Sequence, residues 1–294
     1  MTRIIDRLSD IASGYDVLLC DLWGCLHNGE HPYAPAVAAL EAFRAGGGRV
    51  VLLTNSPRPE SGVARQLETI GVPRGAYDCI VSSGDAAQAG MIAGAVGRRV
   101  WHLGPEKDHR FFTAIPDHLA GEPPIERVGF DAAEGIVCTG QFSDDDHPDD
   151  YRGRFLSARE RGLKLLCANP DIVVDHADRR LWCAGALAQL YTEMGGESLY
   201  FGKPHPPIYD LARRRLAALG GSPANDRILA VGDGLHTDVQ GAIAEDIDVI
   251  LVTGGLAAAE TATPTMTAQP DPDRLKGFLE GKGLSPTYAM GGLR

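Results

Sequence analysis

The segment that constrains the fold of this chain most is an apolar run followed by one aspartate and a glycine turn. Residues 17–26 read Val-Leu-Leu-Cys-Asp-Leu-Trp-Gly-Cys-Leu, and their continuous apolar start is typical of a buried parallel strand. Asp21 follows that strand, at the edge where open α/β sheets bind their ligands. Gly24 allows the backbone to turn tightly beside it. We therefore expect an α/β fold in which Asp21 takes part in chemistry.

The bulk properties narrow the class of protein and its partners. A chain of 294 residues is long enough for two domains, and its net charge of −11 argues against nucleic acid or an anionic membrane as a partner. The six cysteines include no CxxC pair, which favours buried, reduced thiols. The first residues lack the apolar core of a signal peptide, and no run approaches the length of a membrane span. We expect a cytoplasmic protein.

Strand and helix patterns alternate along the chain. Apolar runs predict strands, and apolar residues at helical spacing predict the helices between them. The expected strands are 17–20, 49–53, 79–81, 99–103, 135–138, 163–167, 198–201, 227–231 and 248–252. The expected helices begin near 35, 59, 85, 149, 208 and 238, with one late helix near 275–278. This alternation predicts a Rossmann-like, doubly wound parallel sheet with helices on both faces.

Polar side chains follow four of these strands. They are Asp21, the pair Thr54 and Asn55, Lys203, and Asp233 with Asp238. Because parallel strands of one sheet point their carboxyl ends the same way, these groups can converge on one crevice.

The residue types suit the transfer of a phosphoryl group. Asp21 and Asp233 supply two carboxylates for a hard divalent cation, and Lys203 adds a positive charge for a phosphoryl oxygen. Thr54 offers a hydroxyl donor, and the turn through Ser56 offers backbone amides to phosphate oxygens. An aspartate in such a field can act as a nucleophile and form an aspartyl-phosphate.

As a set, these segments resemble the four motifs of the haloacid dehalogenase superfamily. The segments are Asp21-Leu22-Trp23-Gly24, Leu53-Thr54-Asn55, Gly202-Lys203-Pro204 and the run from Gly232 to Asp238. The chain between Thr54 and Lys203 is far longer than one crossover requires. That length, together with Asn169-Pro170-Asp171 and Cys183 to Ala186, resembles the class IIA branch, which includes nucleotide-monophosphate, phosphoglycolate and pyridoxal-phosphate phosphatases.

The resemblance implies a domain organisation. Residues 1–83 and 195–294 would form the hydrolase core, and residues 84–194 would form an inserted α/β cap of the C2 type. Class IIA relatives often dimerise through the cap, so a homodimer is left open.

The resemblance also implies a role for each site residue. Asp21 would be the nucleophile and a Mg²⁺ ligand, the Trp23 carbonyl and Asp233 would be further ligands, and Asp238 would support the metal site from outside. Thr54, Asn55 and Lys203 would bind the phosphoryl group, with Ser56 in the same turn. We also expect Asn169, Asp171, Asp175 and His176 to line the mouth of the cap, where Asn169 and Asp171 would contact the substrate.

Trp23 departs from the pattern of the family. Its phosphatases carry an aspartate there, which protonates the leaving group, whereas an indole has no proton to give in the useful pH range. His27, His205 and His236 are candidates to replace this acid. We expect a Mg²⁺-dependent phosphatase-like hydrolase of a small phosphorylated metabolite, slowed or altered by this loss. The alternatives are a degenerate protein that binds a phosphorylated ligand without turnover, and cleavage of a carbon–phosphorus or carbon–halogen bond.

Overall fold

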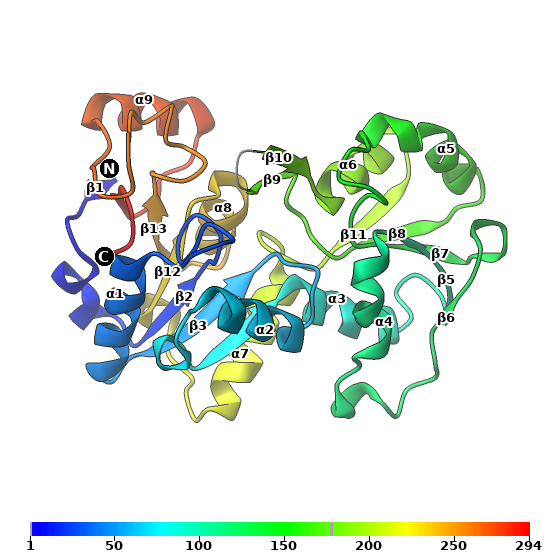
Figure 1. Ribbon diagram of the computed structural model, residues 1–294, viewed down its shortest axis with the longest axis horizontal. Helices are drawn as coiled ribbons and strands as arrows, with labels where there is room; N and C mark the ends of the chain where they lie inside the picture. Colours follow the sequence, from blue (N-terminus) through cyan, green and yellow to red (C-terminus); the bar gives the residue numbers. More distant parts are fainter. Residues whose placement is uncertain (1, 177–178) are drawn as a thin grey trace. The chain divides into compact units, whose positions relative to one another are not determined.

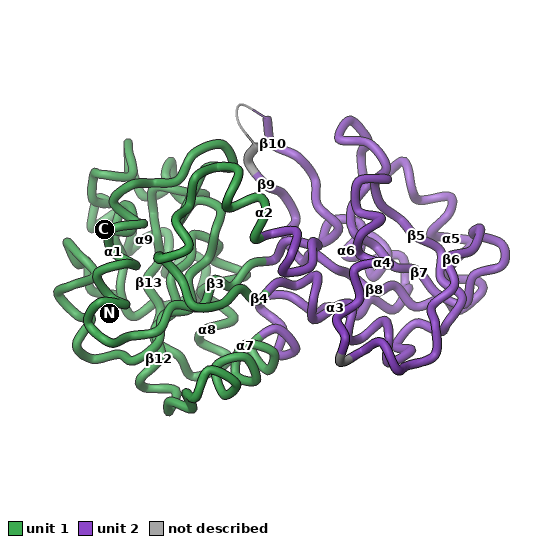
Figure 2. Tube along the Cα trace, turned by 60° about the horizontal axis from the view of Figure 1, so that its bottom comes forward, with its two compact units in different colours: residues 1–54, 64–81, 209–294 green, residues 55–63, 82–208 purple. Residues whose placement is uncertain are grey.

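The computed structural model describes residues 2–176 and 179–294 of the chain. Two compact units divide them, and Figure 2 gives each its own colour. Unit 1 contains the chain up to residue 54 together with 64–81 and 209–294, and unit 2 contains 55–63 and 82–208. The expected cap boundaries at 84 and 194 stay a prediction.

Unit 1 is built on a seven-stranded sheet in the order β1-β14-β13-β12-β2-β3-β4. All pairings from β1 to β3 are parallel, and Figure 1 shows β12, β2 and β3 side by side. The strands are β1 (Arg3–Ile4), β2 (Val17–Cys20), β3 (Arg49–Thr54), β4 (Cys79–Ser82), β12 (Ile228–Gly232), β13 (Asp248–Val252) and β14 (Tyr288–Met290). Every residue of β2 and β12 is buried, as their apolar composition predicts.

The connections of this sheet are mainly helical. They include α1 (Ala34–Ala45), α2 (Glu60–Ile70), α7 (Pro206–Ala218), α8 (Gln240–Ala244) and α9 (Pro272–Lys282). Helix α2 begins in unit 2 and α7 begins there too, so both pass from one unit into the other along the chain.

Unit 2 contains a second parallel sheet, in the order β11-β8-β7-β5-β6. Its strands are β5 (Arg99–Leu103), β6 (Glu126–Arg127), β7 (Gly135–Cys138), β8 (Lys164–Cys167) and β11 (Glu197–Tyr200). Its helices are α3 (Ser83–Ile92), α4 (Arg110–Thr113), α5 (Arg152–Glu160) and α6 (Ala184–Glu193).

Alternate residues of this sheet pack into two separate cores. Ile136 belongs to a cluster with Phe155 of α5 and Leu187 of α6, whereas the next residue, Val137, belongs to a cluster with Met91 of α3. Because successive side chains of a strand point to opposite faces, helices cover both faces of the sheet. The expectation of doubly wound α/β architecture is confirmed.

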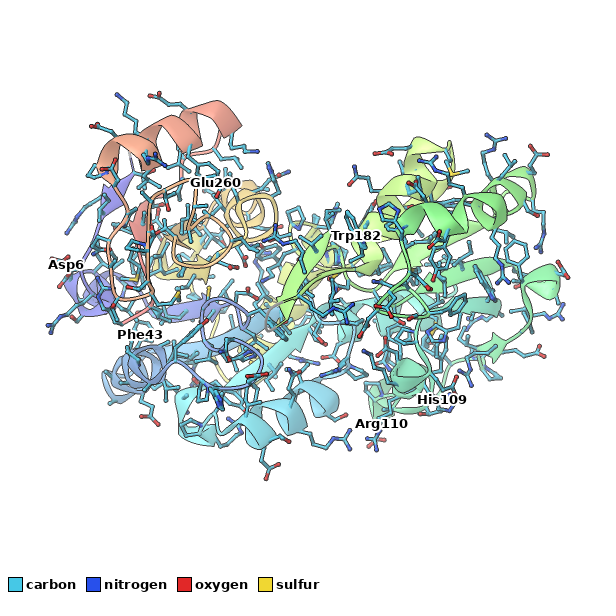
Figure 3. The ribbon with its side chains drawn as sticks, turned by 45° about the horizontal axis from the view of Figure 1, so that its top comes forward. Asp6, Phe43, His109, Arg110, Trp182 and Glu260 are labelled. Atoms are coloured by element: carbon cyan, nitrogen blue, oxygen red, sulfur yellow. The ribbon has the colours of Figure 1, made fainter. Side chains whose placement is uncertain are left out.

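Each of the nine expected strands is present within about one residue of its predicted ends. The sequence patterns missed β1, β6, β14 and an antiparallel hairpin of β9 (Val173–His176) and β10 (Arg179–Trp182). Trp182, labelled in Figure 3, ends that hairpin, and its carbonyl accepts a hydrogen bond from Gln141 Nε2 at 2.8 Å. No helix among the described residues has the length and apolar character to cross a membrane.

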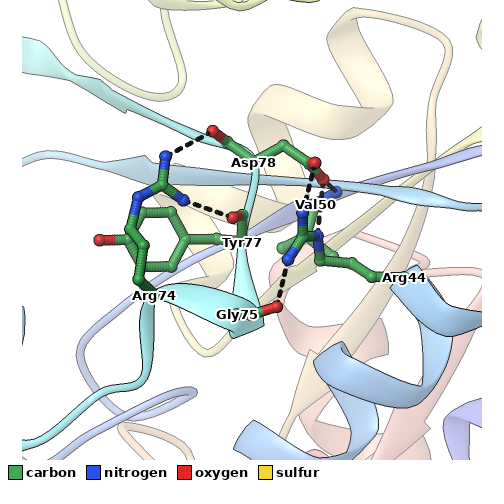
Figure 4. Close-up of polar contacts among 6 residues, drawn as sticks. All are labelled: Arg44, Val50, Arg74, Gly75, Tyr77 and Asp78. Atoms are coloured by element: carbon green, nitrogen blue, oxygen red, sulfur yellow. Dashed lines mark hydrogen bonds and ion pairs between the residues drawn. The ribbon is translucent and has the colours of Figure 1, made fainter.

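In unit 1, an ion pair links helix α1 to the beginnings of strands β3 and β4. Arg44 donates to Asp78 from Nε at 3.0 Å and from Nη2 at 2.7 Å, and Asp78 also accepts the Val50 N–H at 2.8 Å (Figure 4). A further hydrogen bond joins Arg44 to the Gly75 carbonyl. Burial acts to raise the pKa of Asp78, but the hydrogen bonds from Arg44 and Val50 outweigh it and lower the pKa overall.

We expect Asp78→Asn to destabilise the protein by about 1–2 kcal/mol, because it removes a bidentate, charge-assisted pair at a largely buried carboxylate. The pKa of Asp78 is depressed in the folded state, so its contribution is complete above the unfolded pKa of about 3.9 and is lost as the pH falls through the folded value. Urea unfolding at pH 7 and at low pH measures both effects. The matched control is Asp16→Asn, which breaks an exposed pair with Arg227 and should cost less. Equal losses for the two variants would contradict this prediction.

Candidate functional site

Two carboxylates follow adjacent parallel strands of unit 1. Strands β2 and β12 pair so that Cys20 lies opposite Val231, and the Asp21 N–H donates to the Val231 carbonyl at 2.8 Å. Asp21 and Asp233 therefore leave the sheet at the same edge. Their carboxylate oxygens lie within 4.8 Å of each other and of the Cys25 sulfur, and all three side chains are buried. This spacing is close enough for the two carboxylates to share one cation.

Glycines leave room around the Asp233 carboxylate. A Cβ on Gly24 would lie 2.2 Å from Asp233 Oδ2, and one on Gly255 would lie 2.1 Å from the same atom. Gly24 also has a φ of +71°, in the left-handed region that glycine adopts without strain. The Leu256 N–H donates to Asp233 Oδ2 at 3.1 Å, which orients the carboxylate. The backbone around Asp233 thus holds this oxygen in place and admits no side chain there.

Asp238 stabilises the turn that follows β12. It lies in a π-helix, Leu235–Val239, that leads into α8, where the sequence predicted one helix from about 238 to 244. Its Oδ2 accepts the Gly234 N–H at 3.1 Å and faces the Thr237 hydroxyl at 3.4 Å. A Cβ on Gly232 would lie 2.1 Å from the Asp238 side chain. Asp238 therefore stabilises the loop that carries Asp233, and its role in a metal site stays a prediction.

Cys25 is the member of this cluster that sequence reasoning missed. It was expected only as a buried, reduced thiol, yet its sulfur lies beside both carboxylates. Burial first, and then the charges of Asp233 and Asp21, raise the pKa of its thiol. Cys25 lies four residues after Asp21, in a turn closed by the hydrogen bond from the Leu26 N–H to the Leu22 carbonyl at 2.8 Å. This short spacing from Asp21 is the sequence signal that could have identified it.

Trp23 packs against its own loop. Its ring covers Gly29, where a Cβ would lie 2.3 Å from Trp23 Cη2, and it meets the His27 ring edge-on with centroids 5.3 Å apart. The Trp23 ring therefore occupies a defined position and requires glycine at residue 29.

His27 is fully buried, and burial lowers its pKa to about 4. Its Nδ1 accepts the Gly29 N–H at 2.9 Å, which places the proton of the neutral ring on Nε2. Nε2 has no hydrogen-bond partner among the described residues. A neutral imidazole at pH 7 is a poor proton donor, so His27 does not fit the role of the missing acid.

His205, a second candidate acid, stacks on Tyr200 with ring centroids 4.7 Å apart, and burial lowers its pKa.

Four other predicted site residues come together within unit 2. Asn55 and Lys203 form a reciprocal pair: Asn55 Nδ2 donates to the Lys203 carbonyl at 3.0 Å, and the Lys203 N–H donates to Asn55 Oδ1 at 2.7 Å. Asn55 Nδ2 also donates to Asp171 Oδ1 at 2.8 Å, and the Asp171 N–H donates to Asn169 Oδ1 at 3.0 Å. Lys203 is only 3% exposed. This network links the residues expected to bind phosphate with those expected to contact the substrate.

The close packing behind this network depends on Gly202, because a Cβ there would lie 2.5 Å from Asn55 Oδ1. Ser56 follows Asn55, and its carbonyl accepts the Gly84 N–H at 3.0 Å. Thr54 ends β3 in unit 1 and is 2% exposed. All predicted site residues are therefore buried or partly buried at the carboxyl ends of strands or in the loops that follow.

Two buried aspartates at one edge of a parallel α/β sheet form an arrangement that suits a metal-assisted hydrolase. Comparison with known proteins agrees. Residues 18–115 match the family model of haloacid dehalogenase-like hydrolases, and residues 200–275 match a second model of the same group. A hydrolase of this family from Brucella suis 1330 is 39% identical in sequence. Its crystal structure superposes with a TM-score of 0.84 over 99% of this chain and 100% of that one.

The chain belongs to the haloacid dehalogenase-like hydrolases and is an enzyme of the hydrolase class. It is 29% identical to a D-glycerol 3-phosphate phosphatase of Mycobacterium tuberculosis over 86% of this chain and 67% of that protein. A dihydroxyacetone phosphatase of Corynebacterium glutamicum is 29% identical over 33% of this chain and 34% of its own length. A structure of a glycerol phosphate phosphatase from M. tuberculosis in complex with magnesium is 26% identical, with a TM-score of 0.65 over 97% of this chain and 77% of that one.

Proposed function

We propose that the protein is a Mg²⁺-dependent phosphatase of small phosphorylated metabolites that works through an aspartyl-phosphate on Asp21. The observation that carries the proposal is the pair of buried carboxylates, Asp21 and Asp233, on adjacent strands of a parallel sheet. The two curated relatives are named a D-glycerol 3-phosphate phosphatase and a dihydroxyacetone phosphatase, which favours a short polyol or triose phosphate as substrate of this protein.

The donor set fits magnesium. The carboxylates of Asp21 and Asp233 are hard oxygen ligands, and the Trp23 carbonyl would be a third, which leaves further positions for water and a phosphoryl oxygen. Bound there, Mg²⁺ would neutralise charge on the phosphoryl group and on the carboxylates. Asp238 would keep the Asp233 loop in shape, because it already accepts the Gly234 N–H.

The proposed reaction has two displacements at phosphorus. A carboxylate oxygen of Asp21 forms a bond to phosphorus while the bond to the leaving oxygen breaks. Water then attacks the phosphorus of the aspartyl-phosphate, which releases inorganic phosphate and restores the Asp21 carboxylate. Thr54, Asn55 and Lys203 would hold the phosphoryl oxygens, with Ser56 in the same turn, and Asn169 and Asp171 would contact the rest of the substrate.

The proposed cap, residues 84–194, would supply specificity contacts and exclude water, as lids of enzymes do. A homodimer that forms through this cap stays a prediction.

A screen of phosphorylated metabolites tests the proposal. The set contains glycerol 3-phosphate, dihydroxyacetone phosphate, phosphoglycolate, nucleoside monophosphates, pyridoxal phosphate and p-nitrophenyl phosphate, each with Mg²⁺ and with EDTA. We expect phosphate release from at least one of them to rise at least about 10-fold with Mg²⁺. Release that is the same with EDTA, or absent throughout, would contradict the proposal.

A second candidate function is favoured by Trp23, which stands where the family's phosphatases carry their acid. Under this alternative the protein binds a phosphorylated ligand without hydrolysing it. Calorimetric binding of a phosphate that the protein never hydrolyses, with equal inertness of the wild type and Asp21→Asn, would support it over the phosphatase.

A further inference from the structure

The Cys25 thiol lies among the proposed metal ligands but has no task in the proposed hydrolysis. Its sulfur lies within 4.8 Å of carboxylate oxygens of both Asp21 and Asp233, and the side chain has no exposed surface. All three residues belong to unit 1 and to two neighbouring loops at the end of β2 and β12. A cation bound by the two carboxylates would therefore lie close to a sulfur atom as well as to oxygens.

Sulfur changes which cation such a site prefers. Mg²⁺ takes oxygen ligands in an octahedral arrangement, whereas Zn²⁺ and Co²⁺ accept thiolate and carboxylate together in a tetrahedral one. In a tetrahedral zinc site a sulfur and an oxygen ligand are about 3.6 Å apart, from bond lengths of about 2.3 and 2.1 Å. The separation of a sulfur and an oxygen atom, at most 4.8 Å here, would therefore have to shrink by no more than about 1.2 Å for them to bind one Zn²⁺.

We propose that Cys25, Asp21 and Asp233 form a binding site for a thiophilic divalent cation, with Zn²⁺ as its representative, that competes with Mg²⁺ and inhibits the enzyme. The inference rests on the metal site of the proposed function. On binding, the S–H bond of Cys25 breaks, a zinc–sulfur bond forms, and one proton goes to solvent. A Zn²⁺ ion bound by these three side chains would have one tetrahedral position left for water, and it would occupy the place of the Mg²⁺ that the proposed hydrolysis requires.

Cobalt reports the bond directly, because a Co²⁺–thiolate bond absorbs in the near ultraviolet and Co²⁺ bound to oxygen alone does not. We expect this band when Co²⁺ is added to the metal-free, full-length protein, and we expect Cys25→Ser to lack it. Cys25→Val is the second variant, to be used if serine at this buried position prevents folding, which circular dichroism checks. Cys79→Ser is the matched control, since Cys79 lies on β4 of the same unit outside this cluster, and it should keep the band.

Calorimetry measures the preference itself. We expect Zn²⁺ to bind Cys25→Ser at least about 10-fold more weakly than wild type, because loss of a direct ligand costs no less than loss of a group that supports one, and we expect Mg²⁺ affinity to change less. Titrations in two buffers that differ in ionisation enthalpy should show one more proton released per Zn²⁺ by wild type than by Cys25→Ser.

The two proposals fail in different ways. A folded wild type without the cobalt–thiolate band, or Zn²⁺ affinities equal in wild type and Cys25→Ser, would overturn the thiophilic site even if Mg²⁺-dependent hydrolysis is present. The band together with a phosphate screen that shows no Mg²⁺-dependent release would support the thiophilic site and overturn the phosphatase.

Discussion

Asp21→Asn is expected to remove Mg²⁺-dependent phosphate release almost completely, with a loss in kcat of at least about 10³-fold. The amide keeps the size of the side chain but lacks the charged oxygen that attacks phosphorus, and it is a weaker ligand for a divalent cation. Initial rates on the best substrate of the screen, with saturating Mg²⁺, measure the loss. Without the Asp21 carboxylate the aspartyl-phosphate cannot form, so the proposed reaction has no other route.

Asp226→Asn is the matched control, because it makes the same chemical change at an exposed aspartate before β12. It should keep the wild-type rate. A folded Asp21→Asn that retains more than about a tenth of wild-type activity would contradict the role of Asp21 as nucleophile.

Trp23→Asp is expected to raise the turnover of alkyl phosphates by up to about 10²-fold, and that of aryl phosphates much less. The wild type has no acid at this position, so a departing alkoxide gains no proton, whereas a phenolate leaves without one. The comparison of kcat for glycerol 3-phosphate and p-nitrophenyl phosphate in the two proteins measures this difference. The substitution also has a second effect: the Trp23 ring covers Gly29, so its removal opens space beside His27.

Trp23→Asn distinguishes the effect of the new acid from the effect of the space that the ring leaves. It removes the ring as Trp23→Asp does but supplies no proton, so it should not restore alkyl phosphate turnover. His27→Ala tests whether the histidine already serves as the acid, and the pKa of about 4 leads us to expect that leaving-group sensitivity stays as in wild type. Equal gains from Trp23→Asp and Trp23→Asn would contradict the prediction, since they would show that space and not the acid limits the rate.

Most strands of the two sheets could be predicted, because a buried strand is recognisable as a continuous run of apolar residues. Continuous apolar runs such as residues 17–20 and 228–232 are buried along their whole length. The hairpin β9–β10 left no such record, since its residues 179 and 180 are exposed arginines. The short strands β1 and β14 were also missed, because two or three residues carry too little periodicity to recognise.

The family could be predicted because four short motifs stand at strand ends in a set order, and the match to haloacid dehalogenase-like hydrolases confirmed it. The role of each site residue stays a prediction, and so do the cap boundaries.

The sequence by itself determined the α/β class, the order of the strands along the chain and the residue types available for chemistry, because these depend on local patterns of burial and turn formation. Only the tertiary structure decided which groups meet: Cys25 beside Asp21 and Asp233, and Asn55 between Lys203 and Asp171. It also decided that His27 is buried and neutral. Distances and pKa values depend on which strands pair and on how much water each side chain loses, and residues that are neighbours in the sequence determine neither of these.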